Sequence, residues 1–227
     1  MPKPPSKKWV NREERVRAIL PVLKRAYPDA KCSLDYTKPL ELLVATILSA
    51  QCTDDRVNIV TRSLFKKYKT AKAYASAPPD ELEKDIQSTG FYRNKAKSLR
   101  GMGRALVNDH GGEVPRSMDE LTALAGVGRK TANVVLGNAF GIDVGVVVDT
   151  HVGRLSRRLD LTDHDDPVDV EQDLMRVIPK GEWTMWAHLM IAHGRAICQA
   201  RKPKCPECPI LKWCPTGQAN VAGDTGE

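Results

Sequence analysis

Apolar residues recur along this chain at the three- and four-residue spacing of amphipathic helices. One stripe covers residues 16–23, with Asn11 ahead of it as a candidate N-cap and Pro21 inside it as a candidate kink. Residues 40–50 are apolar on nearly every side, which predicts a fully buried helix. The other stripes predict helices over residues 54–64, 79–90, 96–106, 117–124, 167–177 and 183–197.

Capping residues support several of these boundaries. Asp54 can cap the helix that follows it, Pro79 suits a first helical turn, and Ser117 with Glu120 matches a capping box. The strand-like run Val144–Val148 is short and has no partner strand, and an isolated strand is not stable. The pattern therefore predicts an all-α fold.

Composition narrows the class of protein. A chain of 227 residues makes one large domain or two small ones, with enough core to fold without disulfides. The 35 Lys and Arg against 28 Asp and Glu favour an anionic partner, nucleic acid first. No apolar run suggests a membrane span, and no h-region follows the basic start. Residues 1–9 and 215–227 have little to bury and are expected to be flexible.

The segment Leu121–Ala132 contains a short helix, a Gly126-Val127-Gly128 turn and the start of a second helix. The glycines permit a tight turn and close approach of a ligand to the backbone. The unpaired amides and the dipole at the start of the second helix favour an anion. The segment therefore predicts a phosphate-binding helix-hairpin-helix, with an ordinary helix-turn-helix corner as the simpler alternative.

Lys130, in the same segment, is either a phosphate contact or an amine nucleophile. An ordinary lysine has a pKa of about 10.4, so forming the neutral amine at pH 7 costs about 4.6 kcal/mol. A helix N-terminus disfavours a cation by about 0.3–1 kcal/mol, ~2 at most. Desolvation or a nearby base would have to supply the rest.

Asp149 directly follows an apolar run and precedes a predicted helix over residues 150–159. Its simplest role is that of an N-cap. Its carboxylate could also stabilise a developing sugar cation or move protons for a lysine amine.

The six cysteines are unevenly distributed. Cys32 and Cys52 stand alone, whereas four others fall within 17 residues of a chain with no signal peptide. Such clustering indicates a metal or cluster site in a reducing compartment. One Cys-x2-Cys pair with an outlying cysteine on each side favours an iron–sulfur cluster, and tetrahedral zinc is the alternative. The four candidate ligands are Cys198, Cys205, Cys208 and Cys214.

Together these motifs resemble the endonuclease III family of helix-hairpin-helix DNA glycosylases and abasic-site lyases. The resemblance runs from about Leu40 to Cys214. It is carried by Leu48-Ser-Ala-Gln51-Cys-Thr-Asp54, Gly90-Phe91-Tyr92, Leu124-Ala-Gly-Val-Gly-Arg-Lys-Thr-Ala-Asn133, Val148-Asp149-Thr150-His151 and the four-cysteine spacing.

The resemblance implies two helical domains flanking a DNA-binding cleft. The first is a six-helix module with the helix-hairpin-helix, over residues 32–141. The second, over residues 1–31 and 142–227, holds a [4Fe–4S] cluster. The implied protein is a monomeric, cytoplasmic, nucleoid-associated repair enzyme. It removes oxidised pyrimidines from double-stranded DNA and cleaves the strand at abasic sites.

The resemblance also implies residue roles. Lys130 attacks the anomeric carbon of a flipped nucleotide and forms a Schiff base, and Asp149 assists it. Gln51 fills the hole left by the flipped base, and Phe91 is the wedge beside the opposite base. The lesion pocket includes Asp54 and His151. The other implied DNA contacts are Gly126, Gly128, Arg129, Thr131, Arg201, Lys202 and Lys204.

The sequence departs from the family pattern in four places, of which the first affects the hairpin turn and the last three affect lesion preference more than chemistry. Ala125 stands where proline is common, and Cys52 where a small residue such as alanine is common. Phe91 is bulkier than the usual aliphatic wedge, and the segment 140–148 is one residue longer than expected.

Three other functions are alternatives to this one. A mismatch adenine glycosylase would lack the lysine at position 130 and would carry an extra C-terminal domain. A lesion-specialised or lyase-dominant paralogue would fit the altered pocket borders. A non-catalytic helix-hairpin-helix DNA-binding module would bind phosphates without needing Lys130 and Asp149 together.

Overall fold

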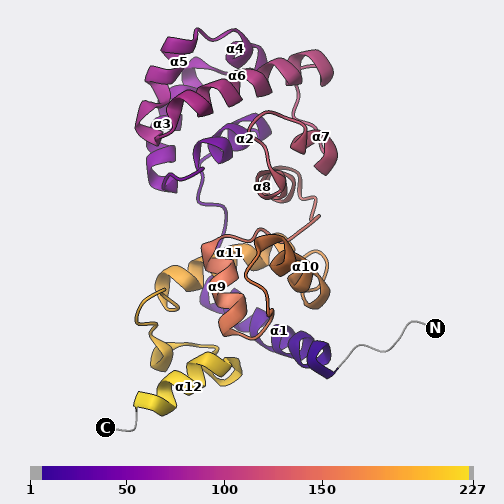
Figure 1. Cartoon of the computed structure of the whole chain (residues 1–227), viewed down its shortest axis with the longest axis vertical. Coiled ribbons are helices and arrows are strands. Elements are labelled where there is room, and N and C mark those ends of the chain that lie inside the picture. The colour runs from indigo at the N-terminus through magenta and orange to yellow at the C-terminus, as the bar shows by residue number, and fades with distance from the viewer. Residues whose placement is uncertain (1–6, 225–227) are drawn as a thin grey trace, which may run out of the picture. The chain divides into compact units, whose positions relative to one another are not determined.

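The computed structural model describes residues 7–224, which form helices and loops with no strand in that range (Figure 1). The all-α prediction is confirmed. The chain divides into two compact units. One is Cys32–Val144, and the other combines the described parts of Met1–Lys31 and Gly145–Glu227. No helix in the described range is both long and apolar enough to span a bilayer.

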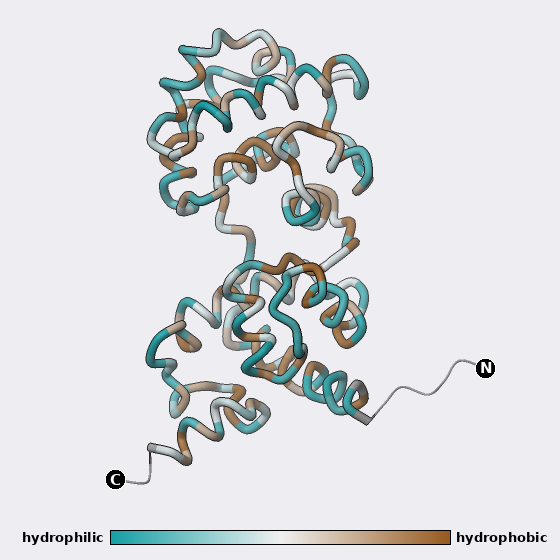
Figure 2. The backbone as a smooth tube through the Cα atoms, in the orientation of Figure 1, coloured by the Kyte–Doolittle hydropathy of each residue, from teal (hydrophilic) through white to brown (hydrophobic). Residues whose placement is uncertain are grey.

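The unit Cys32–Val144 is built around its first helix, α2 (Pro39–Leu48). Residues 42–48 of α2 are all buried, because α3, α6 and α8 pack around it, and its trace is largely brown in Figure 2. The predicted buried helix is therefore confirmed. The other helices of this unit are α3 (Asp54–Lys67), α4 (Ala71–Ser76), α5 (Pro79–Ile86), η1 (Gln87–Thr89), α6 (Tyr92–Asp109), α7 (Met118–Thr122) and α8 (Arg129–Phe140).

The short helix α4 has no counterpart in the sequence prediction, because six residues show no repeated apolar stripe. It packs closely against α6 at Gly103. A Cβ atom at Gly103 would lie 2.7 Å from the backbone oxygen of Ala71, so this contact requires glycine. The structure thus has seven α-helices in this unit, one more than the predicted six-helix module.

In the unit Cys32–Val144, local capping follows the sequence with one correction. The Ser117 hydroxyl accepts a hydrogen bond from the Glu120 amide, as the capping-box pattern predicts. The cap of α3 is Thr53, whose hydroxyl accepts from the Arg56 amide. The prediction of Asp54 as that cap is wrong, because Asp54 already lies inside the first turn.

The second unit contains α1 (Lys7–Ala26), which packs against α10 and α11 although at least 140 residues separate it from them in sequence (Figure 1). The predicted stripe of α1 is buried. Asn11 lies inside this helix and is not its N-cap, because α1 begins at Lys7. The other helices are α9 (Thr150–Arg158), α10 (Pro167–Val177), α11 (Trp183–Ala196), η2 (Cys205–Glu207), η3 (Leu211–Trp213) and α12 (Pro215–Asp224).

The flexible ends predicted from the sequence need correction. Residues 7–9 belong to α1 and residues 215–224 form α12, while 1–6 and 225–227 lie outside the described residues. The helix α12 has few apolar residues, so its pattern gave no helical signal. It is held by contacts with η2, η3 and α9, and buried Gly217 lies against Leu211 and Cys214.

Candidate functional site

The Gly126-Val127-Gly128 turn joins α7 to α8 and leaves the start of α8 open. Gly126 has φ of 78°, and a Cβ there would lie 2.7 Å from the Ser98 Cβ atom, so the turn itself requires glycine. Gly128 is exposed, and a Cβ there would meet nothing within 4 Å. Gly128 is the N-cap of α8 and has no side chain to bond the first amides. These amides therefore form a suitable site for an anion.

Three side chains follow this open helix start. Arg129 and Lys130 are exposed, and Thr131 is half-buried. The unit thus presents two cationic side chains together with the dipole of a 12-residue helix. The fold of this unit does not bury Lys130, so a bound partner would have to shield its amine from water.

Ala125, which stands where the family often has proline, lies beside α6. A Cβ at Gly101 of α6 would come 3.0 Å from the Cβ of Ala125. A small residue at position 125 opposite a glycine therefore lets the turn pack closely on α6.

Gln51 and Phe91 share an unusual backbone conformation. Gln51 has φ of 52° and Phe91 has φ of 48°, in the left-handed region that non-glycine residues rarely adopt. Both side chains are exposed, and Phe91 is 62% exposed although it is a large apolar residue. Strained backbone of this kind costs about 1–3 kcal/mol and tends to occur at functional sites. These are the two positions at which the family resemblance implies insertion into DNA.

Asp54 lies in the same unit, three residues after Gln51. It lies in the first turn of α3, and its Oδ2 atom accepts a hydrogen bond of 2.5 Å from the Ser33 hydroxyl. Asp54 is half-buried, so part of its carboxyl group is accessible.

Asp149 caps α9 and also contacts His151. Its Oδ1 atom accepts hydrogen bonds of 2.8 Å from the amides of His151 and Val152, which confirms the capping role. Its Oδ2 atom lies 3.1 Å from Nδ1 of His151. The two side chains remain 21% and 27% exposed. One carboxylate oxygen thus anchors the helix, and the other faces a titratable ring.

His151 is positioned by close helix packing. A Cβ at Gly194 of α11 would lie 2.8 Å from the His151 Cδ2 atom, so α9 approaches α11 closely at this point. Gly194 was not among the residues predicted from the sequence.

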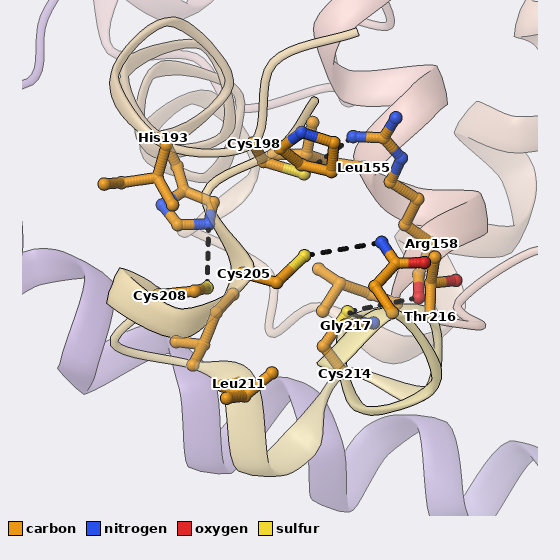
Figure 3. Close-up of a pocket in the computed structure, with 15 residues that line it drawn as sticks. Leu155, Arg158, His193, Cys198, Cys205, Cys208, Leu211, Cys214, Thr216 and Gly217 are labelled. Atoms are coloured by element: carbon orange, nitrogen blue, oxygen red, sulfur yellow. Dashed lines mark hydrogen bonds between the residues drawn. The ribbon is translucent and has the colours of Figure 1, made fainter. Parts of the chain in front are cut away.

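The four clustered cysteines line one cavity between α9, α11, η2, η3 and α12 (Figure 3). None of them forms a disulfide. Each sulfur has a nitrogen atom close to it. These are Arg158 Nη1 at 3.1 Å from Cys198, Asn220 Nδ2 at 3.4 Å from Cys205, His193 Nε2 at 3.5 Å from Cys208, and the Gly217 amide at 3.2 Å from Cys214.

Burial shifts the pKa values of several side chains that line this cavity. It raises the pKa of Cys208 to about 11 and also raises the pKa of Cys214, and the neighbouring thiols add to both effects. Burial lowers the pKa of His193 to about 4, so its ring is neutral at pH 7. Tyr27 Oη lies 2.8 Å from Nδ1 of this ring. When the tyrosine donates to Nδ1, Nε2–H of His193 points at Cys208.

The loop that carries the cysteines has almost no core of its own. From Cys198 to Cys214, Ile210 is the one buried residue. No three His, Cys, Asp or Glu side chains in residues 7–224 are arranged to hold a single metal ion. Four thiols around one cavity, each with a hydrogen-bond donor, fit a cluster in which each sulfur binds its own iron.

The basic residues of this loop are exposed to solvent. Arg201, Lys202 and Lys204 are all accessible, and Lys202 has φ of 52°. They belong to the unit that contains Asp149, whereas Lys130 belongs to the unit Cys32–Val144.

Sequence reasoning missed the residues that support the predicted ones. Arg154 and Arg158, one turn apart on α9, donate to the backbone oxygens of Cys198, Gln199 and Ala200. Their i, i+4 spacing was the available signal, since it places both guanidinium groups on one helix face. His193 and Asn220 carried no such signal.

A family model described as HhH-GPD superfamily base excision DNA repair protein matches residues 44–180. The chain is 54% identical to an endonuclease III of Synechocystis over 214 residues, covering 94% of this chain and 98% of the relative. A solved non-covalent endonuclease III–DNA complex superposes with a TM-score of 0.86 at 47% identity, covering 92% of this chain and 98% of the other. A solved structure of a trapped endonuclease III–DNA covalent intermediate, an estranged-adenine complex, also superposes with a TM-score of 0.86. Its sequence identity is 48%, and the coverage of both chains is the same.

Proposed function

Because the chain belongs to the HhH-GPD superfamily of base excision DNA repair proteins, and within it to the endonuclease III family, we propose that it is a bifunctional DNA glycosylase and abasic-site lyase. Its substrate is duplex DNA with oxidised pyrimidines or abasic sites, which it meets at the nucleoid. The observation that carries the proposal is Lys130, exposed at the uncapped start of α8 directly after the Gly-Val-Gly turn. Covalent trapping on damaged DNA tests it.

Lys130 is the nucleophile in this proposal. The damaged nucleotide is rotated out of the duplex, because its sugar carbon cannot be reached inside the base stack. The Lys130 amine attacks the anomeric carbon, and the bond to the base breaks as the base leaves with its electron pair. The sugar ring opens to a Schiff base, loss of a C2′ proton follows, and the 3′ phosphate departs. Bound DNA supplies the shielding that the exposed amine lacks in the free chain.

Asp149 assists this step through the carboxylate oxygen that is not occupied in capping. It stabilises the positive charge that develops on the sugar and exchanges protons with the lysine amine and the leaving base. His151, 3.1 Å from that oxygen, holds the carboxylate in place.

Asp149→Asn separates catalysis from capping. Asparagine caps a helix about as well as aspartate, so the variant is expected to fold and to bind DNA as before. Base release is expected to fall by roughly 10²–10⁴-fold, because the charge is lost. Single-turnover release of thymine glycol measures this, and Asp166→Asn, the same change at the cap of α10, is the control. If Asp149→Asn releases the base as fast as the original protein does, Asp149 acts only as the N-cap of α9.

DNA binding in this proposal is mainly electrostatic. The open amides of α8 bind a phosphate, and the exposed Arg201, Lys202 and Lys204 are further phosphate contacts. Gln51 replaces the flipped base in the stack, and Phe91 inserts beside the opposite base.

The salt dependence of binding tests this picture. If about five phosphates are neutralised, log K should fall with log salt at a slope of about −4 to −5. The double variant Lys202→Gln/Lys204→Gln should make the slope less steep by roughly 2. Lys180→Gln, an exposed lysine elsewhere in the same unit, should leave it unchanged. A slope near zero for the original protein would contradict the phosphate contacts.

The cavity lined by the four cysteines is proposed to hold a [4Fe–4S] cluster. Bound there, the cluster would supply positive charge that keeps the buried thiols ionised, and it would cross-link a loop that has only one buried residue. Arg158, His193, Asn220 and Gly217 would donate hydrogen bonds to its sulfur ligands. Its role in this proposal is to fix the shape of the DNA-binding loop.

A lyase-dominant or lesion-specialised enzyme is the second candidate function. Phe91 is 62% exposed and bulkier than the usual aliphatic wedge, so it places a larger side chain beside the opposite base. An adduct on abasic DNA without one on thymine glycol DNA would support this candidate.

A further inference from the structure

We infer that Lys95 is a positioning residue that holds the two DNA-inserting loops, those of Gln51 and Phe91, at a fixed separation. The inference rests on the proposed function, since it concerns how these two side chains reach DNA together. It assigns a role to a lysine that neither the catalytic step nor phosphate binding uses.

The geometry of Lys95 is unusual for a lysine. It lies in the first turn of α6 and is only 5% exposed. Its Nζ atom donates hydrogen bonds of 2.8 Å to the backbone oxygens of both Leu48 and Thr89. Lysine is almost never this buried unless its ammonium group is paired, so these two oxygens account for its placement.

The two acceptors belong to the two inserting loops. Leu48 is the last residue of α2, three residues before Gln51, and Thr89 ends η1, two residues before Phe91. One ammonium group therefore binds the base of each loop. Without it, two buried carbonyls that end helical segments would have no partner.

The strained backbone of the loops explains why such a tie is needed. Gln51 and Phe91 both have positive φ, a conformation that persists only when its surroundings determine it. The Phe91 loop has two further local bonds, from the Thr89 hydroxyl to the Ile86 oxygen at 2.8 Å and from the Lys95 amide to the Phe91 oxygen at 3.1 Å. These bonds shape one loop, whereas the Lys95 side chain joins it to the other.

Joint positioning matters for flipping a base. The side chain that fills the hole and the wedge beside the opposite base must enter the duplex at the same step, and unstacking a base costs a few kcal/mol. At an abasic site the base is already gone, so no base has to be unstacked before the strand is cleaved. Loss of Lys95 should therefore impair excision of a damaged base more than cleavage at a ready-made abasic site.

The test compares Lys95→Met with Lys97→Met. Lys97 is exposed on the same helix, two residues further along, and is the matched control. We expect Lys95→Met to slow release of thymine glycol by about tenfold or more, and to slow cleavage at an abasic site by less than about threefold. The ratio of the two rates does not depend on how much enzyme is folded, so general destabilisation does not change it.

A double-mutant cycle shows whether Lys95 acts through the loops. In a Gln51→Ala/Phe91→Ala background, Lys95→Met should change the ratio little, because the side chains that it positions are gone. The fluorescence of 2-aminopurine placed opposite the lesion should rise on binding the original protein and rise less with Lys95→Met. Lys95→Gln, which keeps two N–H donors, replaces Lys95→Met in the same assays if the methionine variant does not fold.

The two possible failures can be told apart. If the original protein is active and the ratio of thymine glycol release to abasic-site cleavage is the same for the Lys95 and Lys97 variants, the role of Lys95 is wrong but the proposed function still holds. An undiminished effect of Lys95→Met in the double-alanine background would lead to the same conclusion. Absence of base release and of trapping by the original protein would overturn the proposed function, and this inference with it.

Discussion

Lys130→Gln is expected to abolish the covalent complex that borohydride traps between this protein and damaged duplex DNA. A glutamine amide cannot form a Schiff base, so no reducible bond to the sugar exists in the variant. Base release should fall by on the order of 10³-fold or more, as for loss of a nucleophile in other enzymes. Because Lys130 is exposed and its side chain is not part of the core, the variant should fold and bind DNA.

The experiment uses two substrates and a matched control. Original protein, Lys130→Gln and Lys97→Gln are each incubated with thymine glycol DNA and with abasic DNA before reduction. Adducts on both substrates, lost only in Lys130→Gln, are the expected result. An adduct on abasic DNA alone would indicate a lyase-dominant enzyme. No adduct with intact DNA binding would indicate a monofunctional enzyme or a binding module.

If the cysteine cavity holds the proposed [4Fe–4S] cluster, the original protein is expected to be brown and to contain iron, and Cys208→Ala is expected to lose the colour and nearly all of the iron. Each cubane cluster needs its four thiolates, and the loop from Cys198 to Cys214 has only Ile210 as buried core. The loop should therefore unfold locally, and DNA affinity should fall because Arg201, Lys202 and Lys204 lose their fixed positions. Visible absorbance, iron content and DNA titration measure these effects.

The control for the cluster is Cys32→Ala. Cys32 is another partly buried free thiol, in the unit Cys32–Val144, and its loss should change neither colour nor iron content. A colourless, folded original protein that contains zinc after anaerobic purification would contradict the cluster.

The catalytic and ligand candidates could be identified from sequence because their signals are local. The helix-hairpin-helix, Asp149 ahead of α9 and the cysteine spacing each lie within about 20 residues, so neighbouring positions define them. The same holds for the buried stripe of α1, the mostly apolar α2 and the Ser117 cap. Where the local signal was weak, prediction failed: α4 and α12 have no apolar stripe, and Thr53 rather than Asp54 caps α3.

By itself, the sequence determined the all-α class, the helices with a clear apolar face and the residue types available for chemistry. The tertiary structure decided which other groups hold the candidate site residues in place. Lys95 reaches the Leu48 oxygen across 47 residues, and Arg158 reaches the Cys198 sulfur across 40. Contacts of that separation leave no periodic trace in the chain. The left-handed backbone of Gln51 and Phe91 also left no trace in the sequence, because non-glycine residues rarely adopt that conformation by preference.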